Sequence, residues 1–159
     1  MKRKWLSLLL AASIVASPSY LLTGNALALE ANKNALAGQA YESEDAEFLG
    51  DAQSDTSYSG YSGSGYVACG NQVGDGVRFT NVEVPEEGDY TVFLRYGNGD
   101  SAARTMSIYA NDRVEDAQQI LFPQLKSWGL WDDVPVTVHL NAGTNTVTVV
   151  AEEGDSAGI

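Results

Sequence analysis

The chain has 159 residues, of which 9 are basic and 21 acidic, and its formal net charge at pH 7 is −12. This length suits one domain rather than two. So negative a surface repels nucleic acid and anionic lipid, which excludes both as expected partners, and it attracts divalent cations such as extracellular Ca²⁺.

The N-terminal segment is predicted to be a secretory signal peptide over residues 1–28. Three basic residues at 2–4 precede an apolar run over 6–15, and a small-residue cleavage site follows at 26–28. Neither this run nor any later segment is long enough to span a bilayer. We therefore expect a secreted, extracellular protein with a linker or flexible arm over 29–40. Loss of the three basic residues changes the net charge from −12 to −15.

From Tyr41 onwards, short alternating runs separated by Gly, Asn and Asp predict an all-β domain over 41–159. The expected strands are 41–48, 65–68, 77–84, 90–96, 105–110, 114–122, 134–140 and 145–151. Turn-forming sequences at 85–89, 111–112 and 141–145 separate several of them. About eight short strands at this spacing predict an antiparallel β-sandwich, with the jelly roll as its expected form.

The first expected strand poses a problem of charge. In an extended segment alternate residues share a face, so Glu42 and Glu44 would lie side by side, together with Ala46 and Phe48. Two neighbouring carboxylates repel one another unless solvent or a cation separates their charges. The pattern leaves both explanations open: a wet face and a cation site.

Three further features have a structural and a functional interpretation. Cys69 is the only cysteine, so no internal disulfide is possible, and we expect a small buried thiol rather than a reactive one. His139 falls at an outward position of the strand 134–140 and is expected at the surface. The Gly/Ser-rich stretch 58–66 carries tyrosines and is either a flexible turn or a loop that lines a ligand site.

Five separated stretches, taken together, resemble family 35 carbohydrate-binding modules, which are close relatives of family 6. They are YESEDAEF, GYSGSGYV, GVRFTNVEVPEEGDYTVFLRYGNG, ARTMSIYAND and LFPQLKSWGLWDDVPVTVHLNAGTNTVTVV. The resemblance covers nearly all of residues 41–159. It implies a β-sandwich jelly roll, a non-catalytic role in sugar binding, a bound structural calcium and attachment to a polysaccharide-degrading enzyme.

The resemblance also assigns the glutamate pair. In the family, two glutamates near the start of the domain help to hold the calcium, and Glu42 and Glu44 match them. Members continue beyond the position of Ile159 with a last strand, whose aspartate completes the calcium shell. Because 154–159 is typical of a turn that leads into a strand, we expect the module to be truncated at its C-terminal end.

The expected sugar site centres on the segment 127–131. An exposed indole stacks on the flat C–H face of a sugar while polar neighbours bind its hydroxyls. The resemblance assigns Trp128 as the platform and Trp131 as a packing residue; the alternative places both in the core. It further matches Asn98, Arg104 and Tyr61 to sugar contacts, and each of these three has a purely structural alternative.

Two other classes of function remain open. A small glycosidase or lyase needs two carboxylates across a cleft; the adjacent acidic pairs at 86–87, 132–133 and 152–153 lie in or beside predicted turns. A structural or adhesive surface domain has no need of two tryptophans in a loop. We therefore expect a monomeric module that directs a secreted enzyme to a polysaccharide or oligosaccharide, with neutral glycans favoured over uronates by the negative charge.

Overall fold

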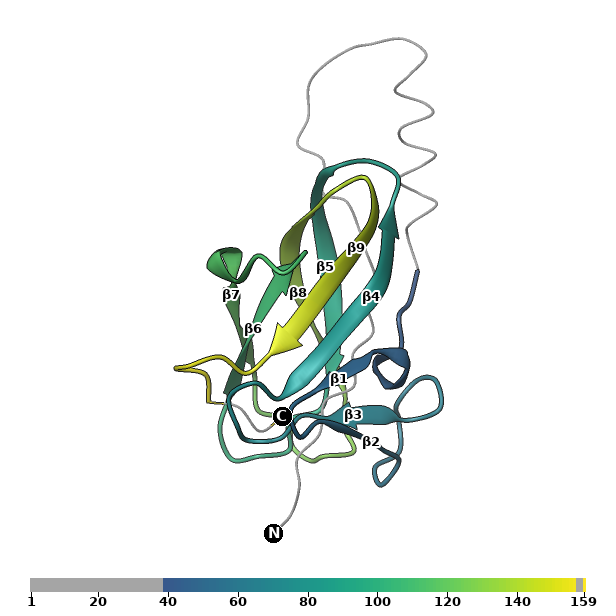
Figure 1. Cartoon of the computed structure of the whole chain (residues 1–159). Coiled ribbons are helices and arrows are strands. Elements are labelled where there is room, and N and C mark those ends of the chain that lie inside the picture. The colour runs from purple at the N-terminus through teal and green to yellow at the C-terminus, as the bar shows by residue number, and fades with distance from the viewer. Residues whose placement is uncertain (1–38, 157–158) are drawn as a thin grey trace, which may run out of the picture.

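The computed structural model describes residues 39–156 and 159 (Figure 1). The predicted signal peptide and most of the predicted arm lie outside the described residues. The elements are η1 (Ser43–Asp45), β1 (Glu47–Leu49), β2 (Gln53–Asp55), β3 (Tyr66–Ala68), β4 (Gly76–Val84), β5 (Gly88–Tyr96), β6 (Arg104–Ala110), η2 (Val114–Asp116), β7 (Gln118–Phe122), β8 (Asp132–Leu140) and β9 (Gly143–Val150).

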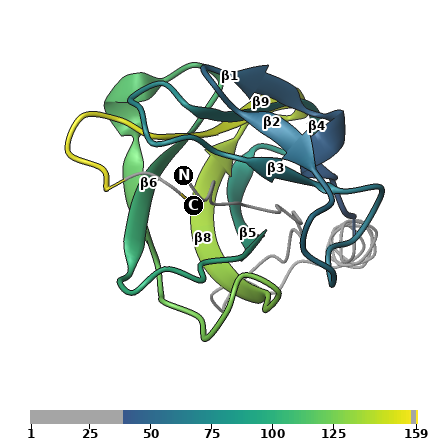
Figure 2. The same ribbon diagram turned by 90° about the horizontal axis from the view of Figure 1, so that it is seen from below.

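The strands form one large sheet and two strand pairs. The five-stranded sheet has the order β1-β4-β9-β6-β7, and the two pairs are β2-β3 and β5-β8. All the pairings are antiparallel. Buried residues from β3, β5 and β8 share one hydrophobic core with residues of the large sheet, and Figure 2 shows the strands arranged around that core. The predicted antiparallel β-sandwich is confirmed.

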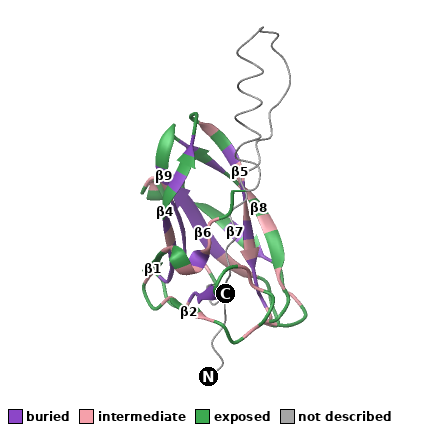
Figure 3. Cartoon of the chain, turned by 90° about the vertical axis from the view of Figure 1, so that its right-hand side faces the viewer, coloured by how far each residue is buried: buried purple, intermediate pink, exposed green. Residues whose placement is uncertain are grey.

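Strand β5 shows why the sequence folds in this way. Figure 3 colours the ribbon of β5 by burial. Its residues alternate between buried and partly exposed, and the buried ones are Tyr90, Val92, Leu94 and Tyr96. Burial of each such side chain stabilises the fold by about 1.5–3 kcal/mol. The partner strand β8 pairs with β5 along its whole length. The alternation in the sequence therefore predicted both strands correctly.

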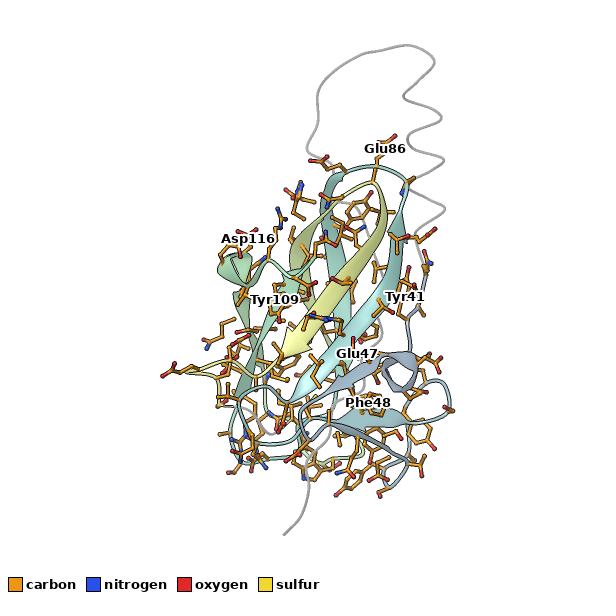
Figure 4. The ribbon with its side chains drawn as sticks, viewed as in Figure 1. Tyr41, Glu47, Phe48, Glu86, Tyr109 and Asp116 are labelled. Carbon is orange, nitrogen blue, oxygen red and sulfur yellow. The ribbon has the colours of Figure 1, made fainter. Side chains whose placement is uncertain are left out.

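The predicted strand over 41–48 is wrong in its first half. Residues Ser43–Asp45 form the 3₁₀ turn η1, which buries Ser43. The predicted strand is therefore reduced to the short β1, which pairs with β4. Figure 4 shows Tyr41 before this turn and Glu47 and Phe48 after it. The Tyr41 hydroxyl accepts a hydrogen bond at 3.2 Å from the backbone N–H of Glu83. This contact ties the start of the domain to β4.

Two other elements differ from the prediction. The expected strand over 114–122 is divided into η2 and β7, because only Gln118–Phe122 pairs with β6. The strand β2 was not predicted. Its sequence Gln-Ser-Asp has no apolar alternation, and it is extended because it pairs with β3.

The predictions for the single cysteine and the single histidine are confirmed. Cys69 is 2% exposed, and burial raises the pKa of its thiol to about 12, so the thiol is neutral and inert. His139 lies exposed on β8, where Nδ1 is 2.8 Å from the carboxylate of Asp89. That hydrogen bond raises the pKa of the imidazole above its usual value. Within the described residues, no helix is long and apolar enough to cross a membrane.

Candidate functional site

Five aromatic side chains gather where the loop 56–65 meets the loop 123–131. We call Tyr58, Tyr61, Tyr66, Trp128 and Trp131 the aromatic cluster. Tyr66, on β3, is fully buried beneath the cluster, and the other four side chains are partly exposed. Apart from Tyr66, all of them lie in loops or, for Trp131, immediately before β8. The cluster thus combines a buried anchor with accessible rings.

Trp131 locks the two loops together. Its ring centroid lies 5.3 Å from that of Tyr66, with an interplanar angle of 59°. Its indole Nε1–H donates a hydrogen bond of 2.9 Å to the backbone carbonyl of Ser59. The ring therefore has apolar contact on one side and its polar atom satisfied by the loop. This is the packing role that the resemblance assigned to it.

Trp128 is held differently. Its ring centroid is 6.3 Å from that of Tyr58, with an interplanar angle of 34°. The backbone of Gly99 lies against it so closely that a Cβ on Gly99 would come within 2.6 Å of the Trp128 Cγ. The indole is thus fixed by its neighbours and still partly exposed. A positioned, accessible indole is the geometry that a sugar ring needs for stacking.

Asn98 has the structural role rather than the predicted sugar contact. It is 0% exposed. Its amide Nδ2 donates to the carbonyls of Ala102, Phe122 and Pro123 at 3.0, 3.1 and 3.3 Å, and its Oδ1 accepts from the N–H of Asp100 at 3.2 Å. The sequence could not reveal that Asn98 is buried, because the residue lies in a connecting loop and such loops usually run over the surface. The side chain braces the loop 97–103 and has no exposed surface to offer a ligand.

We expect Asn98→Ala to lower the free energy of unfolding by about 2 kcal/mol, because it leaves buried carbonyls without their donor. Urea unfolding measures this change. Asn81→Ala is the matched control: it removes the same amide from an exposed position at the bulge of β4 and should change stability by less than about 0.5 kcal/mol. Equal unfolding midpoints for Asn98→Ala and the wild type would contradict the bracing role.

Arg104 also acts as a brace. Its guanidinium forms an ion pair with Asp100, and its Nη1 donates to the carbonyl of Ser156 at 3.3 Å. The remaining predicted sugar contact, Tyr61, lies in the aromatic cluster, with its ring centroid 5.7 Å from that of Tyr66. The structure therefore brings Tyr61, Trp128 and Trp131 together. Asn98 and Arg104 instead stabilise the loop 97–103 that supports this cluster. Sequence reasoning missed Tyr58, although the Gly/Ser-rich stretch already marked its loop.

The side chains of Glu42 and Glu44 both contact the loop at Gly63, although the two residues do not lie on one continuous strand. Glu42 accepts a hydrogen bond of 2.8 Å from the hydroxyl of Ser62. Glu44 Oε1 accepts from the N–H groups of Ser64 and Gly65 at 2.6 and 3.0 Å. Between them lies Gly63, at φ +62°, where a Cβ would collide with the Glu44 carboxylate.

The second oxygen of Glu44 is the unusual atom here. Oε2 is buried and has no hydrogen-bond partner in the described part of the chain. A buried carboxylate oxygen without a partner is costly and is seldom left so. The described residues contain no group of three or more His, Cys, Asp or Glu side chains that could hold a metal ion. Any cation here would therefore rely on these two carboxylates together with loop oxygens.

Comparison with known proteins places the chain in a family. The family model described as "Carbohydrate binding module (family 6)" matches residues 43–158. A 1,6-alpha-glucosyltransferase of Sporosarcina globispora is 39% identical over 75% of this chain. A cycloisomaltooligosaccharide glucanotransferase of Niallia circulans is 36% identical over 75% of it. The matched regions span only 9% and 12% of these two relatives, which are therefore far longer proteins.

Solved structures give the same result. A family 35 carbohydrate-binding module from Clostridium thermocellum superposes with a TM-score of 0.66 at 32% identity, over 74% of this chain and 88% of that one. The cycloalternan-forming enzyme from Listeria monocytogenes, solved with a pentasaccharide substrate, superposes with a TM-score of 0.67 at 33% identity, over 74% of this chain and 11% of that one. The chain therefore belongs to the carbohydrate-binding modules of family 6 and their family 35 relatives.

Proposed function

We propose that this domain is a non-catalytic module that binds a polysaccharide at the aromatic cluster and directs a secreted carbohydrate-active enzyme to it. The observation that carries the proposal is Trp128, an accessible indole held in place by Gly99 and Tyr58. Tyr61 and Tyr58 extend the ring surface beside it. Stacking on such rings supplies most of the apolar contact that a sugar can make.

The favoured glycan is a neutral α-glucan with 1,6 linkages. Two similar proteins are named for α-1,6-glucosyl and cycloisomaltooligosaccharide chemistry, and a similar solved structure is an isomalto-dextranase of Arthrobacter globiformis complexed with panose. The net charge of −12 opposes the binding of uronates by simple repulsion. A neutral glucan meets no such barrier.

The proposal includes a structural Ca²⁺ held by Glu42 and Glu44. Glu44 Oε2, which has no partner among the described residues, and the crowded contact of both carboxylates with Gly63 support it, since a cation would satisfy the oxygen and offset the repulsion. Calcium takes 6–8 oxygen ligands, which carboxylates and backbone carbonyls supply. Bound there, the ion would join the segment 42–44 to residues 62–65 of the loop 56–65. The same loop carries Tyr58 and Tyr61 of the aromatic cluster.

The catalytic alternative finds little support in the positions of the acidic pairs. Glu86 lies in the turn between β4 and β5, at the opposite end of the sandwich from β2 and β3 (Figures 1 and 4). Asp132 and Asp133 begin β8 next to Trp131 and are exposed; Asp133 is 3.9 Å from Arg95. The general acid of a sugar hydrolase is commonly buried, whereas both of these carboxylates are exposed.

We expect the purified protein to be retarded in native gels that contain dextran, without releasing reducing ends from dextran, mannan or xylan. Binding without turnover is the signature of a module. Gels that contain polygalacturonate provide the contrast. The protein should not be retarded there, because its acidic surface is repelled by the acidic polysaccharide. Turnover that disappears in Asp132→Asn or Asp133→Asn would overturn the proposal in favour of an enzyme. Absence of retardation in every polysaccharide gel would overturn the binding role.

A further inference from the structure

A polar cavity lies at the far end of β3 from Tyr66. Its volume is about 580 Å³. Its walls come from residues 50–53, which lead into β2, and from residues 68–72 with Asp75, which join β3 to β4. It shares no side chain with the glutamate pair. It is therefore separate from both features described above, although β3 connects it to the aromatic cluster.

Asp75 holds the walls of this cavity together. Its side chain is 2% exposed, and its two carboxylate oxygens accept hydrogen bonds from the N–H groups of Asp51 and Gln72 at 2.7 and 2.9 Å. Gly70 packs against the same carboxylate, where a Cβ would collide with it. One buried group thus ties the two loops to one another. The cavity is preformed, as ligand sites usually are.

The lining is suited to a neutral polyhydroxylated ligand. Gln53, Asn71 and Gln72 are exposed, and no hydrogen bond to the described part of the chain engages their side-chain amides. An amide donates and accepts, as a sugar hydroxyl does. The buried amides of Asn98 and Asn145, in contrast, are engaged by backbone groups and, for Asn145, also by the side chain of Asn111. Among the described residues the lining contains no Lys or Arg, and the carboxylate of Asp51 disfavours an anion.

Strand β3 places the cavity next to the aromatic cluster. Tyr66 and Ala68 lie on the same face of β3, away from the main core, and both belong to the cluster in which Tyr58, Tyr61 and Trp131 pack. Ala68 also lines the cavity, as does Gln53, which is its partner on β2. From Tyr66 to Ala68 the strand covers roughly 7 Å, and residues 69–72 continue beyond it to Asn71 and Gln72. A short sugar on the rings would not reach these last two amides, whereas a longer chain would.

We propose that this cavity is a second subsite for the same glycan, which recognises chain length. The polysaccharide stacks on the exposed rings of the aromatic cluster, extends beyond the buried Ala68 to the cavity, and places further sugar units among Gln53, Asn71 and Gln72. The proposal rests on the proposed function, because it takes the aromatic cluster as the first subsite. It explains why three exposed amides that bond to no described residue line one cavity.

The test compares the affinity of short and long ligands by calorimetry, using isomaltose and isomaltoheptaose. For the wild type we expect tighter binding of the longer sugar. Gln53→Ala combined with Gln72→Ala should weaken isomaltoheptaose binding about tenfold, since each lost hydrogen bond contributes of order 1 kcal/mol, and should leave isomaltose binding unchanged. Asn81→Ala is the control, because it removes an exposed amide outside the cavity. Thermal melts check that all variants are folded.

The outcomes separate the subsite from the site on which it depends. Unchanged isomaltoheptaose affinity in the double variant, or an equal loss for both sugars, overturns the second subsite while the aromatic cluster stands. Failure of the wild type to bind either sugar, or dextran, overturns the proposed function together with the subsite. A loss confined to the longer sugar, and absent from Asn81→Ala, supports the assignment.

Discussion

Trp128→Ala is expected to abolish detectable binding to dextran with little change in stability, whereas Trp131→Ala is expected to cost about 3 kcal/mol of stability. Binding by a single module is weak, because a shallow site buries little area and each hydroxyl exchanges water for protein at small net gain. Loss of the platform ring therefore removes most of the affinity. Trp131 instead packs on Tyr66 and donates a hydrogen bond to the carbonyl of Ser59. The stability lost in Trp131→Ala lies at the lower end of the range for Trp→Ala substitutions, because the ring is partly exposed.

Affinity electrophoresis together with thermal melts measures both effects. Phe48→Ala is the matched control, because Phe48 is an aromatic residue on β1 that is 38% exposed and lies outside the aromatic cluster. It should retain binding. A Trp128→Ala variant that binds normally and melts early would reverse the two assignments. If neither tryptophan variant alters the binding of a glycan that the wild type retains, the aromatic cluster is not the site.

Addition of Ca²⁺ is expected to stabilise the protein by about 2.7 kcal/mol at a free concentration one hundred times the Kd. For a domain of this size the melting temperature should rise by about 10 °C. The physical reason is that the ion satisfies the buried Glu44 Oε2 and offsets the repulsion between Glu42 and Glu44, and that it binds only the folded arrangement. EDTA should reverse the shift in differential scanning fluorimetry.

The double variant Glu42→Gln with Glu44→Gln should melt at the same temperature with and without Ca²⁺. Glu86→Gln with Glu87→Gln removes the same number of charges from the exposed turn between β4 and β5, and should keep the calcium response. A melting temperature of the wild type that is insensitive to both Ca²⁺ and EDTA would contradict the assignment. So would an equal response in both double variants.

The sequence by itself determined the class of fold and the family. The alternation of Tyr90, Val92, Leu94 and Tyr96 predicted β5, and a similar alternation predicted β8, because burial of every second side chain is a local pattern that one strand shows without its partner. It also predicted the buried Cys69 and the exposed His139. The five separated stretches that resemble carbohydrate-binding modules were sufficient to identify the family later shown by residues 43–158.

The tertiary structure alone decided how the loops are used. Gln53–Asp55 becomes a strand only because β3 pairs with it, and Ser43–Asp45 forms a 3₁₀ turn that buries Ser43 where the alternation of residues predicted a strand. Asn98 is buried because the carbonyls of Phe122 and Pro123, which are distant in the sequence, meet its amide together with the nearby carbonyl of Ala102. Glu42 and Glu44 meet at Gly63, about twenty residues away, rather than on one strand face. Such contacts depend on where the chain returns after a long loop, and no local periodicity encodes that position.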